Sequence, residues 1–164
     1  MKIQLTAKIA ENFAKKSIGT IKLKEDAEFI LFHTKSVVDT TLMLAEDKKV
    51  DRELIIIAGW LHDMGKIMEL ENHAQHSLEV LEKNGFEVSK KLRDCIINHG
   101  SNGNPECEEA KLIQFADKIS ILHPELVKIL VKYSFKKTNS EKEKDLDFIR
   151  KLLNQCIDVL RLSF

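Results

Sequence analysis

Apolar residues recur at spacings of three and four along almost the entire chain, and this helical periodicity limits the possible folds more than any other feature. A helix expected over residues 25–47 carries on one face Ile30, His33, Val37, Thr41 and Leu44. We find no run of alternating polar and apolar residues that convincingly indicates a strand. The pattern therefore predicts an all-α protein.

A strongly apolar segment, residues 54–61, defines a second helix. Asp51 can cap its N-terminal end, and Gly65 is a natural place for it to stop. With these limits, His62 and Asp63 fall in the last turn of the helix. Two polar residues with potential metal-binding side chains therefore follow directly on a segment that should be buried.

Capping and turn signals divide the rest of the chain. Asn72 can cap a short helix that ends at Gly85, and Ser89 can begin another that ends at Gly100. Residues 101–105 form the clearest loop. Further helices are expected over residues 106–120, 124–136 and 140–161, the last beginning with a Ser-Glu-Lys-Glu capping box.

The bulk properties indicate a compact globular protein. A chain of 164 residues is expected to form one domain, residues 1–164. Its 43% hydrophobic content, with two prolines and six glycines, excludes a disordered or collagen-like chain. The 26 basic and 26 acidic residues cancel, so the net charge neither supports nor excludes a nucleic-acid partner.

The chain shows no sign of a membrane segment or of a disulfide framework. Its longest apolar run, residues 54–61, is far shorter than the roughly 20 residues that span a bilayer, and residues 1–16 are amphipathic rather than signal-like. We therefore expect a cytoplasmic protein. Cys95, Cys107 and Cys156 are odd in number and include no Cys-x-x-Cys pair, which favours buried free thiols.

Ionisable side chains lie on the inward faces of several expected helices: His33, His62 with Asp63, His73, His99 and Asp117. A single buried histidine is usually a structural residue with a backbone partner. Several imidazoles and two carboxylates in one core, however, would be very costly to desolvate without compensation. A divalent cation supplies that compensation, so the set predicts a metal site.

The order His, His-Asp, further histidines and Asp resembles the pattern of the HD domain superfamily of metal-dependent phosphohydrolases. Residues 58–66, Ala-Gly-Trp-Leu-His-Asp-Met-Gly-Lys, are similar to that family's apolar-His-Asp-x-Gly-Lys segment, and residues 115–118, Phe-Ala-Asp-Lys, to its apolar-Ala-Asp-Lys segment. The resemblance implies a helical bundle with a metal-ligand core over about residues 25–120 and C-terminal helices over about 124–161. It also implies a set of core metal ligands: His33, His62, Asp63 and Asp117.

The resemblance leaves the number of metal ions open at one or two. Family members with two ions use two more histidines, which correspond best to His73 and His99, with Asp63 able to bridge. His76 lies one turn from His73 and could replace it, although Ser77 matches the small residue that the family carries four places after its histidine. Imidazole and carboxylate ligands suit Mn, Fe, Co, Ni, Mg or Zn.

The chemistry expected of such a site needs no side-chain nucleophile, because a bound cation lowers the pKa of water and polarises a phosphoryl oxygen. We expect the catalytic residues to be Asp63 and Lys66. Lys66 follows the Gly65 turn, where its ammonium could bind a substrate phosphate. The alternative interpretation is that Lys66 is a solvated lysine at the C-terminal end of a helix.

The expected substrate is a nucleotide-like small molecule that contains a phosphoanhydride or phosphodiester bond. Residues 99–105, 109–113 and 116–118 most nearly resemble the small stand-alone branch that splits dinucleoside polyphosphates. Relatives that act on stringent-response nucleotides carry acidic residues where this chain has Lys66 and Ile67, and the nucleoside-monophosphate phosphatases of the superfamily carry Glu at the first of these positions. Both activities are therefore disfavoured.

Three alternative functions stay open on the sequence. The first is an HD-type nuclease on single-stranded nucleic acid, against which the balanced charge counts and for which a basic groove would count. The second is a di-iron oxygenase, since one branch with the same ligand order oxidises an inositol. The third is a non-catalytic binding module that keeps the metal for stability. The sequence does not indicate an oligomeric state.

Overall fold

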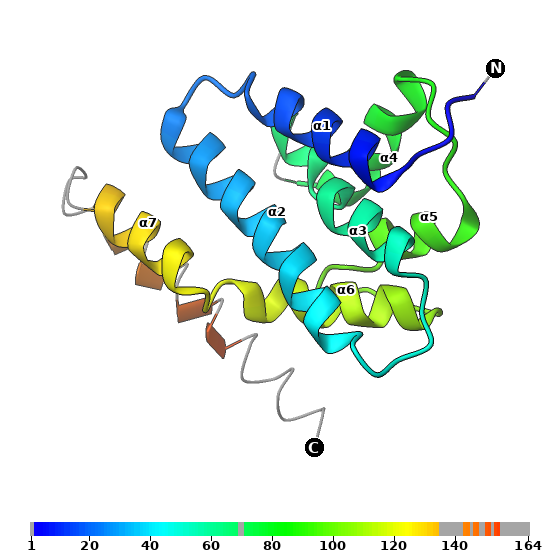
Figure 1. Cartoon of the computed structure of the whole chain (residues 1–164). Coiled ribbons are helices and arrows are strands. Elements are labelled where there is room, and N and C mark those ends of the chain that lie inside the picture. The colour runs from blue at the N-terminus through cyan, green and yellow to red at the C-terminus, as the bar shows by residue number, and fades with distance from the viewer. Residues whose placement is uncertain are drawn as a thin grey trace.

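The computed structural model describes residues 2–68 and 71–134, together with 143–144, 146–147, 150–151 and 153–154. Within these residues the chain forms seven α-helices and one 3-10 turn (Figure 1): α1 Ala7–Ile18, α2 Lys24–Leu44, α3 Arg52–Leu61, η1 Met64–Ile67, α4 His73–Lys83, α5 Lys90–Ile97, α6 Glu108–Ser120 and α7 Pro124–Ser134. In the same residues the β structure is limited to an isolated bridge between Ile3 and Phe86. The predicted all-α fold class is confirmed.

The N-terminal ends of two helices, α3 and α5, agree with the sequence signals. The Asp51 side chain accepts a hydrogen bond from the Leu54 N–H at 3.0 Å, and the Ser89 hydroxyl accepts one from the Leu92 N–H at 3.1 Å. Asn72 does precede α4, but its backbone is left-handed (φ 53°) and its side chain makes no capping hydrogen bond there. The prediction of an Asn72 side-chain cap was therefore wrong.

The helix before the His-Asp pair ends earlier than predicted. α3 stops at Leu61, His62 follows it, and Asp63 precedes η1. Gly65 does not end the α-helix. A Cβ atom there would lie 2.0 Å from the His73 carbonyl oxygen, so the glycine is needed for the close approach of α4.

Helix α5 also ends earlier than predicted, at Ile97 rather than near Gly100. The reason is that a side chain from α6 binds the carbonyl groups beyond it. The Gln114 amide donates to the carbonyl oxygens of Asn98 (3.0 Å), Gly100 (2.9 Å) and Gly103 (3.1 Å). His99 consequently lies in the loop just after α5.

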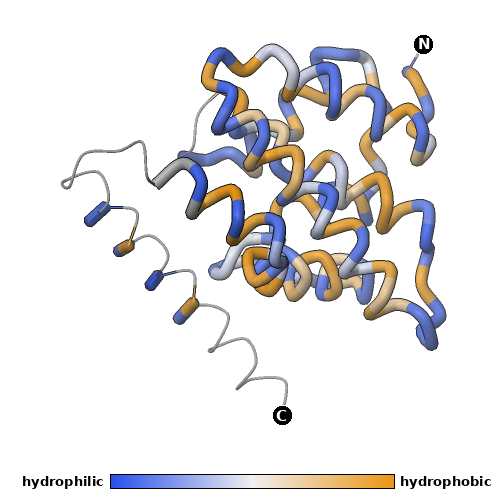
Figure 2. Tube along the Cα trace, turned by 60° about the vertical axis from the view of Figure 1, so that its left-hand side comes forward, coloured by the Kyte–Doolittle hydropathy of each residue, from blue (hydrophilic) through white to orange (hydrophobic). Residues whose placement is uncertain are grey.

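α2 and α3 form the centre of the bundle (Figure 1). α2 contacts α3, α6 and α7, while α1 packs on α3, α4 on η1 and α5 on α6. Gly59 allows α2 and α3 to approach closely, since a Cβ atom there would lie 2.6 Å from Val38 Cγ2. Hydrophobic and hydrophilic residues are interleaved along the helices in Figure 2, as expected for amphipathic helices. One large apolar cluster, which includes Val37, Leu61 and Met64, fills the interior.

The cysteine and membrane predictions are tested only in part. Cys95 is buried and Cys107 is half-buried, and both are free thiols. No helix among the described residues is long and apolar enough to cross a bilayer. Cys156 and the capping box at Ser140 lie outside the described residues, as does most of the helix predicted over 140–161.

Candidate metal centre

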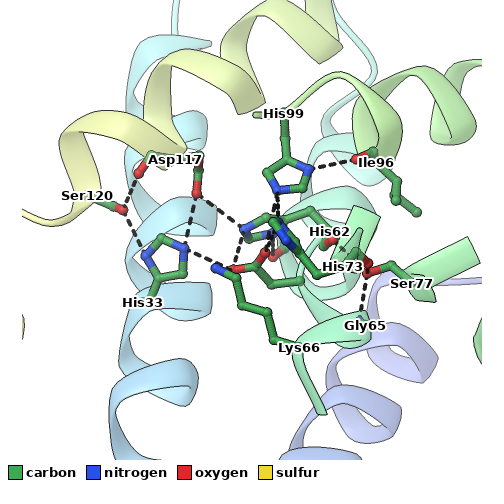
Figure 3. Close-up of polar contacts among 12 residues, drawn as sticks. His33, His62, Gly65, Lys66, His73, Ser77, Ile96, His99, Asp117 and Ser120 are labelled. Carbon is green, nitrogen blue, oxygen red and sulfur yellow. Dashed lines mark hydrogen bonds and ion pairs between the residues drawn. The ribbon is translucent and has the colours of Figure 1, made fainter. Parts of the chain in front are cut away.

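The bundle brings the predicted site residues together at the junction of five elements (Figure 3). His33 lies in the middle of α2, and Asp117 lies in α6. His62 and Asp63 follow the end of α3, where they connect to η1. His73 is the first residue of α4, and His99 follows α5.

The first cluster contains His33, His62, Asp63 and Asp117, and one ligand-type atom of each lies within 4.8 Å of the others. His33 Nε2 is 3.2 Å from Asp63 Oδ2 and 3.1 Å from Asp117 Oδ1. The corresponding distances from His62 Nε2 are 3.4 and 3.6 Å. His62 and Asp63 are completely buried, so this cluster lies inside the bundle.

Hydrogen bonds to the opposite ring nitrogens fix which nitrogen of each histidine faces the carboxylates. The Nδ1–H of His62 donates to the Gly59 carbonyl at 2.9 Å, and that of His99 donates to the Ile96 carbonyl at 2.6 Å. Since the Ser120 hydroxyl donates its proton to the Asp117 carbonyl, its oxygen accepts from His33 Nδ1–H at 3.1 Å. Each neutral imidazole therefore directs an Nε2 lone pair into the site.

The donor set fits a divalent cation. Three buried atoms, His33 Nε2, His62 Nε2 and Asp63 Oδ1, have no hydrogen-bond partner among the described residues. Lone pairs of imidazole and carboxylate that face one another in a buried space repel unless a positive charge lies between them. Nitrogen and oxygen donors in this number are those that first-row divalent metals and Mg²⁺ use in proteins.

The pKa values of His62 and Asp63 also indicate that the first cluster favours a positive charge. Burial opposes protonation of His62, but the Asp63 and Asp117 carboxylates outweigh it and raise the pKa of His62 to about 9. Burial likewise disfavours the charged form of Asp63, yet Lys66 and His62 hold the pKa of this carboxyl well below its usual range. A proton on His62 thus competes with a cation for the same carboxylates.

A second group of ligand atoms is formed by Asp63, His73 and His99. The Nε2 atoms of His73 and His99 lie 3.0 Å apart, and each is 3.4 Å from Asp63 Oδ1. Asp63 thus directs Oδ2 toward the first cluster and Oδ1 toward the second. The His73 side chain is 27% exposed, so the second group opens toward solvent.

The arrangement distinguishes between His73 and His76, the two alternatives for the fourth histidine of the site. His73 faces Asp63, whereas His76 Nδ1 lies 3.4 Å from the Glu79 carboxylate and belongs to neither group of ligand atoms among the described residues. His123 directly precedes α7 and accepts a hydrogen bond from the Glu125 N–H at 3.2 Å.

Lys66 lies at the site, but in contact with an acidic side chain. Its Nζ is 2.5 Å from Asp63 Oδ2, and the side chain is 24% exposed. Burial opposes its charge, yet Asp63 and Asp117 raise the pKa of Lys66. Lys66 also lines a cavity of about 1110 Å³ that borders His33 and His73. It is therefore a charged group at the boundary between the ligand cluster and an open space.

Two residues that support the site, Ser77 and Lys118, were noticed in the sequence, but the contacts they make were not predicted. Ser77 accepts a hydrogen bond from the Gly65 N–H and lies 2.8 Å from the carbonyl oxygens of His62 and His73, so it joins η1 to α4. Lys118 Nζ is 2.6 Å from Asp117 Oδ2. The signals in the sequence were the position of Ser77 four residues after His73 and the Ala-Asp-Lys segment that contains Lys118.

The chain is similar to several known proteins. The HD domain family model matches residues 30–122. Ribonuclease Y of Mycoplasma capricolum subsp. capricolum is 30% identical over 116 residues, which cover 66% of this chain and 22% of the relative. Ribonuclease Y of Finegoldia magna is 34% identical over 96 residues, which cover 58% and 19%. The chain thus spans about a fifth of the length of these curated relatives.

A solved structure supports the fold independently. A crystal structure of a predicted HD superfamily hydrolase from an uncultured Thermotogales bacterium aligns with a TM-score of 0.60 at 20% sequence identity. The alignment covers 96% of this chain and 92% of that one. The two chains therefore share a fold.

Proposed function

This chain belongs to the HD domain family, and on that premise we propose that it is a metal-dependent phosphohydrolase. The proposed reaction is the hydrolysis of a phosphoanhydride or phosphodiester bond in a nucleotide-like substrate. The fold and the family support a hydrolase. The choice of bond and substrate rests on the chemistry of the site.

The observation that carries the proposal is the set of lone pairs around Asp63. Nδ1–H hydrogen bonds leave the Nε2 atoms of His33, His62 and His99 directed at the carboxylates. Asp63 presents one oxygen to each of two groups of ligand atoms. Buried lone pairs and carboxylates arranged in this way are suited to hold a cation. Without a cation, the same polar network in the core would be unfavourable.

The residues are assigned to two cation positions. His33, His62, Asp63 and Asp117 would hold the first ion, and Asp63, His73 and His99 would hold a second. Such an ion supplies an activated water and polarises a phosphoryl oxygen. Burial raises the pKa of the Asp117 carboxyl, but the nearby His33 and His62 rings and the charge of Lys118 outweigh it and hold the pKa well below its usual range.

Lys66 would bind the substrate. Its ammonium lies between Asp63 and the adjoining cavity, so a small side-chain movement brings it to a phosphate oxygen there. A lysine contact to an anionic oxygen stabilises the negative charge that a phosphate carries in both ground and transition states. We assign Lys66 to substrate binding and Asp63 to the ligand set.

A single-stranded RNA is the second candidate substrate. The likeness to proteins named Ribonuclease Y favours it, as do three lysines along the cavity beside the site. The chain corresponds to only about a fifth of those relatives, and its overall charge is balanced. These facts favour a small nucleotide as the first candidate.

One panel tests the function. The purified chain is incubated with nucleotides, dinucleoside polyphosphates and short single-stranded RNAs in the presence of Mn²⁺, Mg²⁺, Co²⁺ or Ni²⁺, and Asp63→Asn is compared with the exposed control Asp39→Asn on α2. We expect metal-dependent hydrolysis by the wild type and Asp39→Asn, and none by Asp63→Asn. Turnover that survives in Asp63→Asn, or a metal-loaded protein inert on every substrate, contradicts the proposal.

A further inference from the structure

A cavity of about 1110 Å³ adjoins the candidate metal centre. His33, Lys66 and His73 form the part of its lining next to the metal centre. The rest comes mainly from the α1–α2 loop and the first turns of α2, with Ile67 from η1. Its volume lies just above the roughly 300 to 1,000 Å³ typical of small-molecule sites.

The lining combines an apolar wall with separate basic groups. The wall includes Ile21, Phe29, Ile30 and Ile67, all of them only half-buried. Three lysines contribute to the same cavity, Lys22, Lys66 and Lys151, against one acidic residue, Asp26. Among the described residues, Lys22 and Lys151 form no ion pair, so their charges are free to meet an anion. An apolar wall beside basic groups, including Lys66 next to the metal centre, suits a ligand that has a flat apolar part and a phosphate.

Phe29 provides the flat surface. Its ring is nearly parallel to that of His33, with an interplanar angle of 5° and 6.2 Å between the ring centroids. Phe29 precedes His33 by four residues of α2, a rise of about 6 Å along the helix axis. A single nucleoside can bridge that spacing, with its base on Phe29 and its phosphate near Lys66 and the ligand cluster.

We propose that this cavity binds one nucleoside monophosphate unit, with the base stacked on Phe29 and the phosphate directed toward Lys66. The proposal rests on the proposed phosphohydrolase function and adds the substrate class and a specificity residue to it. Stacking on an aromatic side chain accepts any base, because every base has a π-face. Phe29 therefore selects for a nucleobase over a bare phosphate without selecting among bases.

Matched ligands isolate the contribution of the base. Isothermal titration of the Mn²⁺-loaded protein compares AMP, ribose 5-phosphate and inorganic phosphate. The variants are Phe29→Ala, Phe29→Leu and Phe29→Trp, with Met43→Ala, exposed at the far end of the same helix, as the control. Phe29→Leu keeps apolar bulk for packing if Phe29→Ala does not fold, and Phe29→Trp keeps an aromatic face.

We expect Phe29→Ala and Phe29→Leu to weaken AMP binding roughly 5- to 150-fold, the equivalent of one lost stacking contact. Ribose 5-phosphate and inorganic phosphate should bind these variants within roughly twofold of the wild type. Phe29→Trp should retain AMP binding, and AMP should quench its added indole fluorescence. Met43→Ala should bind all three ligands as the wild type does.

Two results overturn the pocket: unchanged AMP affinity in both Phe29→Ala and Phe29→Leu, or an equal loss for AMP and ribose 5-phosphate. A 5′-phosphorylated dinucleotide in the same titration distinguishes the end of a strand from a free nucleotide, and dependence on Phe29 supports the pocket in either case. Because the titration needs no turnover, a protein that binds AMP through Phe29 but hydrolyses nothing retains the pocket and loses the proposed function. Conversely, if the protein hydrolyses its substrate equally well with and without the Phe29 ring, the proposed function is retained and the pocket is rejected.

Discussion

The Ser120 hydroxyl oxygen lies 3.1 Å from His33 Nδ1, although the two residues are 87 positions apart in the chain. Ser120 follows Asp117 by three residues on α6 and donates its own proton to the Asp117 carbonyl. The hydroxyl can therefore only accept from His33, which keeps the Nε2 lone pair of His33 directed at Asp63 and Asp117.

Ser120→Ala should weaken metal binding at the first position by about 10- to 100-fold, because His33 loses the partner that fixes its tautomer and ring orientation. Metal titration of the purified protein measures the effect. Ser101→Ala, in the exposed loop, is the control. An unchanged affinity in Ser120→Ala would show that the hydroxyl does not orient His33.

His99→Ala should remove the weaker of two bound ions and leave the tighter one, because His99 reaches only the Asp63 oxygen that faces His73. His76→Ala should keep both ions, since its ring lies against Glu79. Elemental analysis at saturating metal gives the stoichiometry. The same number of ions in His99→Ala as in the wild type would reject the second position.

Lys66→Ala should lower phosphohydrolase efficiency by roughly 10- to 150-fold, which corresponds to the about 1.5 to 3 kcal/mol of a charge-assisted contact. Its fold and metal content should be retained, because Lys66 contacts the carboxylate of a ligand but supplies no lone pair. Steady-state kinetics and metal analysis of one preparation are compared with Lys83→Ala, an exposed control. Wild-type efficiency in Lys66→Ala would show that Lys66 is a solvated lysine with no role in substrate binding. Loss of metal from the variant would show that its role is structural.

Glu109 makes stability depend on pH. Burial opposes its charge, but the Asp51 N–H and the Lys91 ammonium lower the pKa of Glu109 from 4.5 to about 2. Since the folded-state pKa is the lower one, the stabilisation is present above pH 4.5 and is lost as the pH falls toward 2. Glu109→Gln should cost about 2 kcal/mol of unfolding free energy at pH 7, and less at pH 3. Denaturant unfolding at both pH values is the measurement. A constant difference between wild type and variant would contradict this account.

Local signals in the sequence were sufficient for the parts of the fold that depend on local structure. The side chains of Asp51 and Ser89 each accept a hydrogen bond from the backbone N–H three residues later. The capping residue and its partner therefore lie within one helical turn. Gly65 was misassigned as a helix end because its actual constraint is the approach of α4, which is a tertiary contact. Helix ends that depend on another element cannot be derived from their own residues.

The site was predictable to the extent that its chemistry is carried by residue type. His33 and Asp117 were identified because buried imidazoles and carboxylates are costly and therefore conspicuous. Ser120 and Gln114 were not identified, because a serine or a glutamine on a helix gives no signal of its own in the sequence. Their roles depend on partners that lie far away in the chain. The cavity beside Phe29 was missed for the same reason, as its walls come from separate parts of the chain.

The most direct test of the central claim is a crystal structure of the Mn²⁺-loaded protein with anomalous data at the manganese edge. We expect an anomalous peak about 2.0 to 2.3 Å from Nε2 of His33 and His62 and from carboxylate oxygens of Asp63 and Asp117. A well-ordered, metal-loaded structure in which these four groups lie more than about 6 Å from any cation would contradict the metal centre.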